Sequence, residues 1–95
     1  MSSNMLTKPD EIIEKIIDEC CRAAKLHPNW PTDPVHASAI LNEEAGELTQ
    51  AVINWFYHDG NFAEIEKEAL QTGAMVVRFL VNINRYKREH PNENS

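Results

Sequence analysis

The chain has few cysteines and no long apolar run. Its two cysteines, Cys20 and Cys21, are adjacent, and no CxxC or Cys/His metal spacing occurs in the 95 residues. This pattern argues against disulfide-stabilised and zinc-stabilised modules, and small, buried or half-buried thiols in a reducing compartment are expected. No apolar run reaches the roughly 18 residues of a membrane span and no signal-peptide pattern is present, so a cytoplasmic protein without a membrane partner is predicted.

Basic residues are also scarce. Nine Lys and Arg stand against 15 Asp and Glu, which gives a formal net charge of −6. Because binding to a phosphate backbone needs clustered cations, nucleic acid is excluded as a partner. An anionic ligand would need metal ions between itself and this protein.

Apolar residues at helical spacing are what the sequence does contain. They predict an all-α fold of three main helices, near residues 8–26, 34–57 and 61–88, within one domain spanning 1–95. The termini, 1–6 and 90–95, are expected to be flexible. The apolar faces are too extensive for one short chain to cover, so an oligomeric bundle, a dimer or a dimer of dimers, is predicted.

Capping signals mark the ends of these helices. Thr7 can cap the first helix, whose expected role is packing. Asp33 followed by proline is a strong start for the second, and Gly60 offers the left-handed conformation that ends it. Asn61 opens the third as the first residue of an Asn-x-x-Glu capping box. The third helix is expected to run to about residue 88, with 82–84 as its one candidate break.

The second predicted helix contains only three charged residues, Glu43, Glu44 and Glu47, and all are acidic. At about 100° per residue they share one face of the helix. The other flank is expected to be buried, and it comprises Val35, Ala39, Ile40, Leu41, Leu48, Ala51, Val52 and Trp55. Carboxylates on a largely buried helix need a compensating partner, and a divalent metal ion is the usual one.

A narrow polar strip interrupts the apolar surface of the third predicted helix. It comprises Glu64, Glu68, Gln71, Arg78 and Asn82. Two antiparallel helices joined by a short turn bring Glu68 and Gln71 to within roughly one helical turn of the height of Glu44 and Glu47. Oxygen donors on two facing helices suit Mg2+ or Mn2+. A di-iron site is disfavoured because the chain contains no Glu-x-x-His pair.

Two further side chains have two interpretations each. Trp30 lies in a proline-rich connection, where it either plugs the end of the bundle or offers a stacking surface to an aromatic ligand. His36 lies about 20° from Glu47 around the second helix and so looks along its acidic face. It is either a ligand contact or a partly exposed histidine near a helix N-terminus.

Together these residues resemble a known family. Glu43-Glu44-x-x-Glu47, a gap of twenty residues, and then Glu68-x-x-Gln71 is similar to the EExxE…ExxD signature of MazG-like nucleotide pyrophosphohydrolases. These enzymes belong to the all-α NTP pyrophosphatase superfamily, and the similarity covers about residues 30–82. It implies Mg2+-dependent hydrolysis of a (deoxy)nucleoside triphosphate to the monophosphate and pyrophosphate, with Mn2+ as a second metal choice. It also implies assembly as a homodimer or homotetramer.

The resemblance also implies roles for single residues. Glu44, Glu47 and Glu68 would be metal ligands, and Glu43 would position or activate the attacking water, so that all four are catalytic. Gln71 stands where the family has Asp. Its amide oxygen can still coordinate Mg2+, but the site loses one negative charge.

The substrate itself would contact a second set of residues. Arg78 and Asn82 would contact phosphates or ribose, while Trp30 and His36 lie where the family tends to hold the base. The sequence does not specify which base. Two alternatives remain open: a non-catalytic oligomeric helical module that binds metal or nucleotide, and a related phosphohydrolase reaction such as phosphoribosyl-ATP hydrolysis.

Overall fold

The computed structural model describes residues 8–88, and every regular element in that range is helical. The elements are α1 (Pro9–Leu26), α2 (Pro34–Tyr57), α3 (Phe62–Val81) and a short 3-10 helix, η1 (Ile83–Arg85). The prediction of an all-α fold with three main helices is confirmed. The expected cap Thr7 and the predicted flexible termini, 1–6 and 90–95, lie outside the described residues. No helix in residues 8–88 carries an apolar stretch long enough to span a bilayer.

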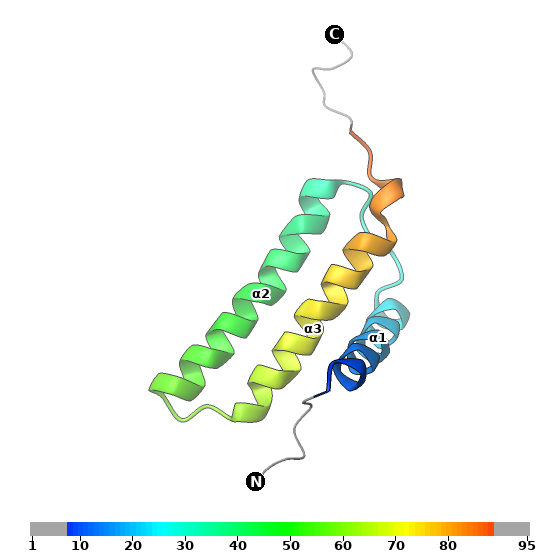
Figure 1. Cartoon of the computed structure of the whole chain (residues 1–95). Helices are drawn as coiled ribbons and strands as arrows, with labels where there is room; N and C mark the ends of the chain where they lie inside the picture. The colour runs from blue at the N-terminus through cyan, green and yellow to red at the C-terminus, as the bar shows by residue number, and fades with distance from the viewer. Residues whose placement is uncertain (1–7, 89–95) are drawn as a thin grey trace.

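The middle helix of the fold is α3. Figure 1 shows α2 running along one side of it and α1 along the other. Within the described range α1 and α2 do not pack against each other, so both depend on α3. Gly73 permits the close approach of α1, since a Cβ at that position would lie 3.0 Å from Cδ1 of Ile16.

The starts of α2 and α3 follow from their capping residues. Asp33 Oδ1 accepts hydrogen bonds from two N–H groups in the first turn of α2, at 2.9 and 3.4 Å, and Pro34 follows it as predicted. Asn61 Oδ1 accepts a hydrogen bond from the Ala63 N–H at 2.9 Å. The predicted capping box also needs a hydrogen bond from the Asn61 N–H to the Glu64 carboxylate, and none is present within residues 8–88. The Glu64 carboxylate instead lies 3.8 Å from the ammonium group of Lys67, one turn further along α3.

The predicted extent of the third helix, 61–88, is wrong at its C-terminal end. The helix ends at Val81, where Asn82 adopts φ −98° and ψ 13°. The side-chain amide of Asn82 donates to the Arg78 carbonyl at 2.8 Å, and its oxygen accepts from Arg85 at 2.8 Å. The Asn82 N–H still donates to the Arg78 carbonyl at 3.2 Å, and the chain then leaves the α-helix at the candidate break for the 3-10 helix Ile83–Arg85.

Gly60 does not adopt the left-handed conformation that was predicted to end the second helix. No glycine among the described residues has a positive φ. A Cβ at Gly60 would instead lie 2.8 Å from the Asn54 carbonyl carbon and 2.9 Å from the Trp55 nitrogen. Glycine is needed here because the chain passes directly against the last turn of α2, where the Gly60 N–H donates to the Asn54 carbonyl at 3.1 Å.

The core is small and built mainly from alanine. Its buried members are Ala23, Trp30, Ala37, Ala74 and Met75. In the described range no large side chain is fully buried. Little apolar surface is therefore removed from water within the single chain, as the length of the sequence predicts.

Most of the predicted apolar flank of α2 is not buried in the single chain. Only Ala51 is buried, while Val35 is 74% exposed and Trp55 45% exposed. The thiols also divide: Cys20 is half-buried and Cys21 exposed, since neighbouring residues on a helix point about 100° apart.

Two glycine substitutions should change stability in opposite directions. Gly60→Ala should lower the free energy of unfolding by about 1–3 kcal/mol, because its methyl group would overlap the backbone of Asn54. Gly46→Ala should raise it by about 0.5–1 kcal/mol, because nothing lies within 4 Å of the added Cβ in this helical position. Urea denaturation of both variants and of the wild type measures these changes in the free energy of unfolding. Equal midpoints would contradict the close approach at residue 60.

Candidate metal centre and adjoining cavities

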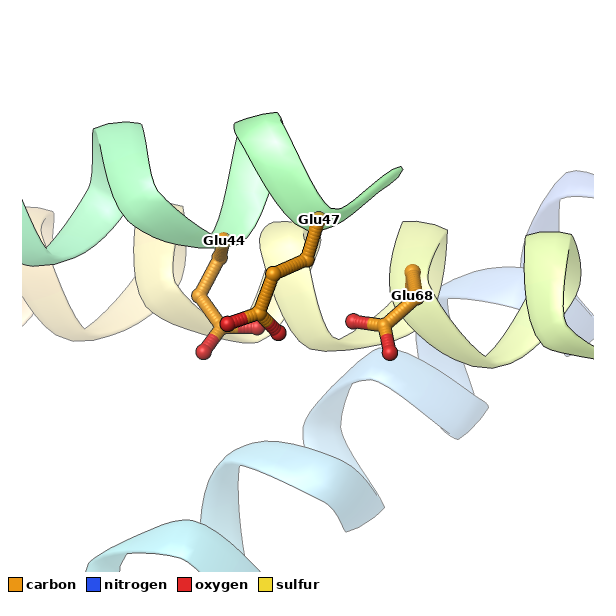
Figure 2. Close-up of side chains that lie close together, drawn as sticks. All are labelled: Glu44, Glu47 and Glu68. Atoms are coloured by element: carbon orange, nitrogen blue, oxygen red, sulfur yellow. The ribbon is translucent and has the colours of Figure 1, made fainter. Parts of the chain in front are cut away.

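Three glutamates from two helices converge at the centre of the α2–α3 pair. Glu44 and Glu47 lie one turn apart on α2, and Glu68 faces them from α3 (Figure 2). One carboxylate oxygen from each lies within 4.8 Å of the other two. The structure therefore brings together three of the four predicted catalytic residues.

The electrostatics of this cluster are unfavourable without a cation. Oε1 of Glu44 and Oε1 of Glu68 are buried and have no hydrogen-bond partner among the described residues. Burial raises the pKa of Glu44, and the charges of Glu47 and Glu68 raise it further. Burial also raises the pKa of Glu68, followed by the charge of Glu47. Desolvation and like charge thus both oppose the ionised state.

The donor set of the cluster suits a hard divalent cation. All three residues offer carboxylate oxygens, and Glu47 is exposed while the other two are half-buried. Mg2+ and Mn2+ prefer such oxygen ligands, and Mg2+ commonly keeps several waters in addition to one or two carboxylates. The two orphaned oxygens give a bound cation a direct stabilising role.

A cavity of about 460 Å3 adjoins the cluster and shares Glu44 with it. All three helices and the connection between α1 and α2 contribute to its lining, which comprises Glu19, Arg22, Ala23, Leu26, His27, Asn29, Trp30, Pro31, His36, Ile40, Glu44, Gln71, Met75 and Arg78. Its size falls in the range of about 300–1,000 Å3 that small-molecule sites occupy. Five predicted site residues therefore line one cavity: Trp30, His36, Glu44, Gln71 and Arg78.

A smaller cavity of about 320 Å3 lies toward the turn between α2 and α3. Glu47 and Glu68 line it together with Glu64. Its other polar lining residues are amides: Gln50, Asn54 and Asn61. The acidic cluster thus adjoins two cavities, which share no lining residue.

Two predicted site residues lie elsewhere. Glu43 is exposed and does not belong to the group formed by Glu44, Glu47 and Glu68. Asn82 lines neither cavity and is engaged by its own hydrogen bonds at the end of α3.

Trp30 and Arg78 are the most deeply buried side chains with polar groups in the wall of the larger cavity, and they contact each other. Both are only 8% exposed. The Arg78 guanidinium lies 4.8 Å from the centre of the Trp30 ring, and Nη2 donates to the His27 carbonyl at 2.7 Å. The burial of Trp30 agrees with the packing interpretation, and its place in the cavity wall keeps ligand contact as a prediction. His36 is exposed at the start of α2 and borders the same cavity.

Sequence reasoning missed Glu19 and Arg22 on α1, which was expected to serve packing alone. Arg22 donates two hydrogen bonds to the Glu19 carboxylate, from Nε at 3.0 Å and from Nη2. These hydrogen bonds are the main cause of the lowered pKa of Glu19. The Gln71 amide lowers that pKa as well. A signal was present in the sequence: Glu19 lies seven residues after Ile12 and four before Ala23, on the packed side of the helix.

Comparison of the chain with protein-family models, with curated protein sequences and with solved structures gives no match in any of the three. What the site can do therefore follows from its own side chains and from the spacing of its motif.

In the metal-free protein, stability should fall as pH rises above 4.5, the ordinary pKa of a glutamate. The pKa values of Glu44 and Glu68 are higher in the folded than in the unfolded chain, so the folded state binds more protons in this window and is favoured at its acidic end. Glu19, whose pKa is lowered, has the opposite effect, below 4.5. Denaturant unfolding in EDTA between about pH 5 and pH 7 measures the slope.

The double variant Glu44→Gln/Glu68→Gln should flatten this profile. Glu14→Gln, on the exposed face of α1, removes one negative charge outside the cluster and should keep the slope. A slope unchanged by the double variant would contradict the assignment of the effect to the cluster.

Proposed function

We propose that this protein is a Mg2+-dependent nucleoside triphosphate pyrophosphohydrolase, which converts a (deoxy)nucleoside triphosphate to the monophosphate and pyrophosphate. The observation that carries the proposal is the convergence of Glu44, Glu47 and Glu68, two of them with orphaned buried oxygens, beside a cavity of ligand size. The motif spacing that resembles MazG-like enzymes selects this reaction among those that an acidic metal site supports.

The charge of the protein supports a metal-mediated reaction. A triphosphate carries several negative charges, and the cluster together with a net charge of −6 would repel it. Glu44, Glu47 and Glu68 would hold the cation, with Gln71 as a further oxygen donor. When bound, Mg2+ neutralises phosphate charge and lowers the pKa of a coordinated water.

The chain's own side chains would divide the remaining work. Glu43 precedes Glu44 on α2 but is exposed outside the three-glutamate cluster, and the resemblance implies that it would position the attacking water or accept its proton. Water attacks the α-phosphorus, and the bond between this phosphorus and the bridging oxygen to the β-phosphorus breaks, so that pyrophosphate leaves. The larger cavity would take the base and sugar, with Trp30, His36 and Arg78 in its wall.

One observation favours the second candidate, a non-catalytic module that binds metal or nucleotide. Gln71 is neutral where the family has a carboxylate, and its amide acts on Glu19 of α1 rather than adding charge to the cluster. A site with one carboxylate fewer binds a divalent cation less strongly. Hydrolysis and metal binding therefore need separate measurements.

We also propose that the chain works as a homodimer or homotetramer. Stripes of large apolar side chains remain exposed on each helix: Ile13 and Ile17, Val52 and Phe56, and Val76 and Leu80. An aromatic group at the α2–α3 turn adds Trp55, Tyr57 and Phe62. Exposed apolar surface of this extent is typical of protein interfaces. A second copy would offer the same helical stripes for packing.

The wild-type protein should release pyrophosphate from at least one member of a dNTP and NTP panel with Mg2+ or Mn2+, and none in EDTA. Mg2+ at 100 times its Kd should raise the free energy of unfolding by about 2.7 kcal/mol. Glu47→Gln should abolish most of this stabilisation and lower the rate on the order of 100-fold. Glu66→Gln, on the same helix as Glu68 but outside the cluster, should retain both properties.

Equal melting temperatures in EDTA and in excess metal would refute the metal centre itself. Stabilisation by metal without pyrophosphate release from any nucleotide would support the non-catalytic alternative.

Sedimentation velocity at micromolar concentration should give the mass of a dimer or tetramer. Val76→Lys/Leu80→Lys should shift the protein toward monomer, because two charges would be buried in the apolar stripe of α3. Ser38→Lys/Thr49→Lys adds the same charge at exposed polar positions of α2 and should have the smaller effect. A wild-type protein that sediments only as a stable monomer would contradict the proposed assembly.

A further inference from the structure

The orientation of Trp30 is fixed from outside the cavity that it lines. Its Nε1–H donates to the hydroxyl oxygen of Tyr86 at 2.9 Å. The same hydroxyl donates to the Phe79 carbonyl at 2.9 Å, so it both accepts and donates. The Tyr86 ring lies 4.9 Å from the Phe79 ring, which keeps the hydroxyl in place.

Two neighbouring contacts hold the same region. The Arg78 guanidinium covers the Trp30 ring at 4.8 Å and is itself tied to the His27 carbonyl. The Lys87 N–H donates to the Thr32 carbonyl at 3.0 Å. The segment after α3 is therefore fastened across the connection between α1 and α2, and Figure 1 shows these two segments side by side at one end of the fold.

Tyr86 does not line the cavity, whereas Trp30 and Arg78 do. Tyr86 can therefore affect a ligand only through the side chains that it holds. We propose that Tyr86 is a positioning residue, which sets the orientation of Trp30 and thereby the affinity of the larger cavity for the base and sugar of a nucleotide. The identity of this ligand rests on the proposed function. The hydrogen bonds that hold Trp30 are independent of that proposal.

Tyr86→Phe removes this control with little change in packing. The phenyl ring can keep its contact with Phe79, but the buried Nε1–H of Trp30 loses its acceptor. Because a buried N–H without an acceptor is unfavourable, the indole should change its orientation, and the shape of the cavity wall should change with it. The acidic cluster contains none of these residues, so its metal affinity should not change.

The test uses equilibrium binding of α,β-methylene nucleotide analogues with Mg2+, which report on the cavity without hydrolysis. Tyr86→Phe should raise Kd by about 3- to 10-fold, the range that one hydrogen bond contributes. In turnover assays KM should rise while kcat stays near the wild-type value. Tyr57→Phe removes the hydroxyl of a tyrosine that is 72% exposed and should change neither quantity.

A double-mutant cycle identifies the hydrogen bond as the cause. Trp30→Phe keeps an aromatic ring but has no N–H to donate, so adding Tyr86→Phe in that background should raise Kd no further. The fluorescence of Trp30, recorded alone in a Trp55→Phe background, should also shift when Tyr86 is replaced by Phe. This spectroscopic signal needs no nucleotide.

Three results would overturn the inference: an unchanged Kd in Tyr86→Phe, an equal loss with and without the Trp30 indole, or no binding of any analogue to the wild type. Binding that responds to Tyr86→Phe without pyrophosphate release from the matching triphosphate would leave the inference standing. That result would count against the proposed hydrolysis alone.

Discussion

Two carboxylate oxygens buried without a partner are the feature on which the site depends. An unsatisfied buried polar group costs about 1–3 kcal/mol, more when charged. Like charges at helical spacing on a surface cost only a few tenths of a kcal/mol. The free-energy cost of burying Glu44 and Glu68 between α2 and α3 is therefore larger than the cost of repulsion between neighbouring glutamates along α2. A cation between the two helices would remove both penalties, and its binding would then be coupled to the packing of α2 on α3.

The middle position of α3 produces both the site and the open apolar faces. Ala74, Met75 and Arg78 of this helix are buried, and within residues 8–88 both α1 and α2 pack on it without packing on each other. All three helices line the larger cavity, and Trp30 forms part of its wall. The same single-layer arrangement leaves the outer sides of all three helices uncovered. The apolar surface that a compact bundle would cover internally therefore stays exposed in the single chain.

Local chemistry predicted most of the fold from the sequence. The Asp33–Pro34 start and the facing glutamates depend on neighbours in sequence and on helical periodicity, so they could be anticipated. Two features could not. The position at which α3 ends depends on how Asn82 bonds its neighbours, and the role of Gly60 depends on the path of the turn against α2. Periodicity defines an apolar face, but tertiary packing selects which part of it is covered.

Gln71 shows how the motif and its surroundings fit together. The residue follows Glu68 by one turn of α3 and lines the cavity with Glu19 and Glu44. An aspartate there would place another carboxylate beside Glu19 and near two glutamates whose pKa values are already raised. A neutral amide can instead donate an N–H to Glu19 while its oxygen remains available to a cation. The departure from the family motif at residue 71 is therefore matched by an acidic residue on α1, and the two positions should be altered together when either is tested.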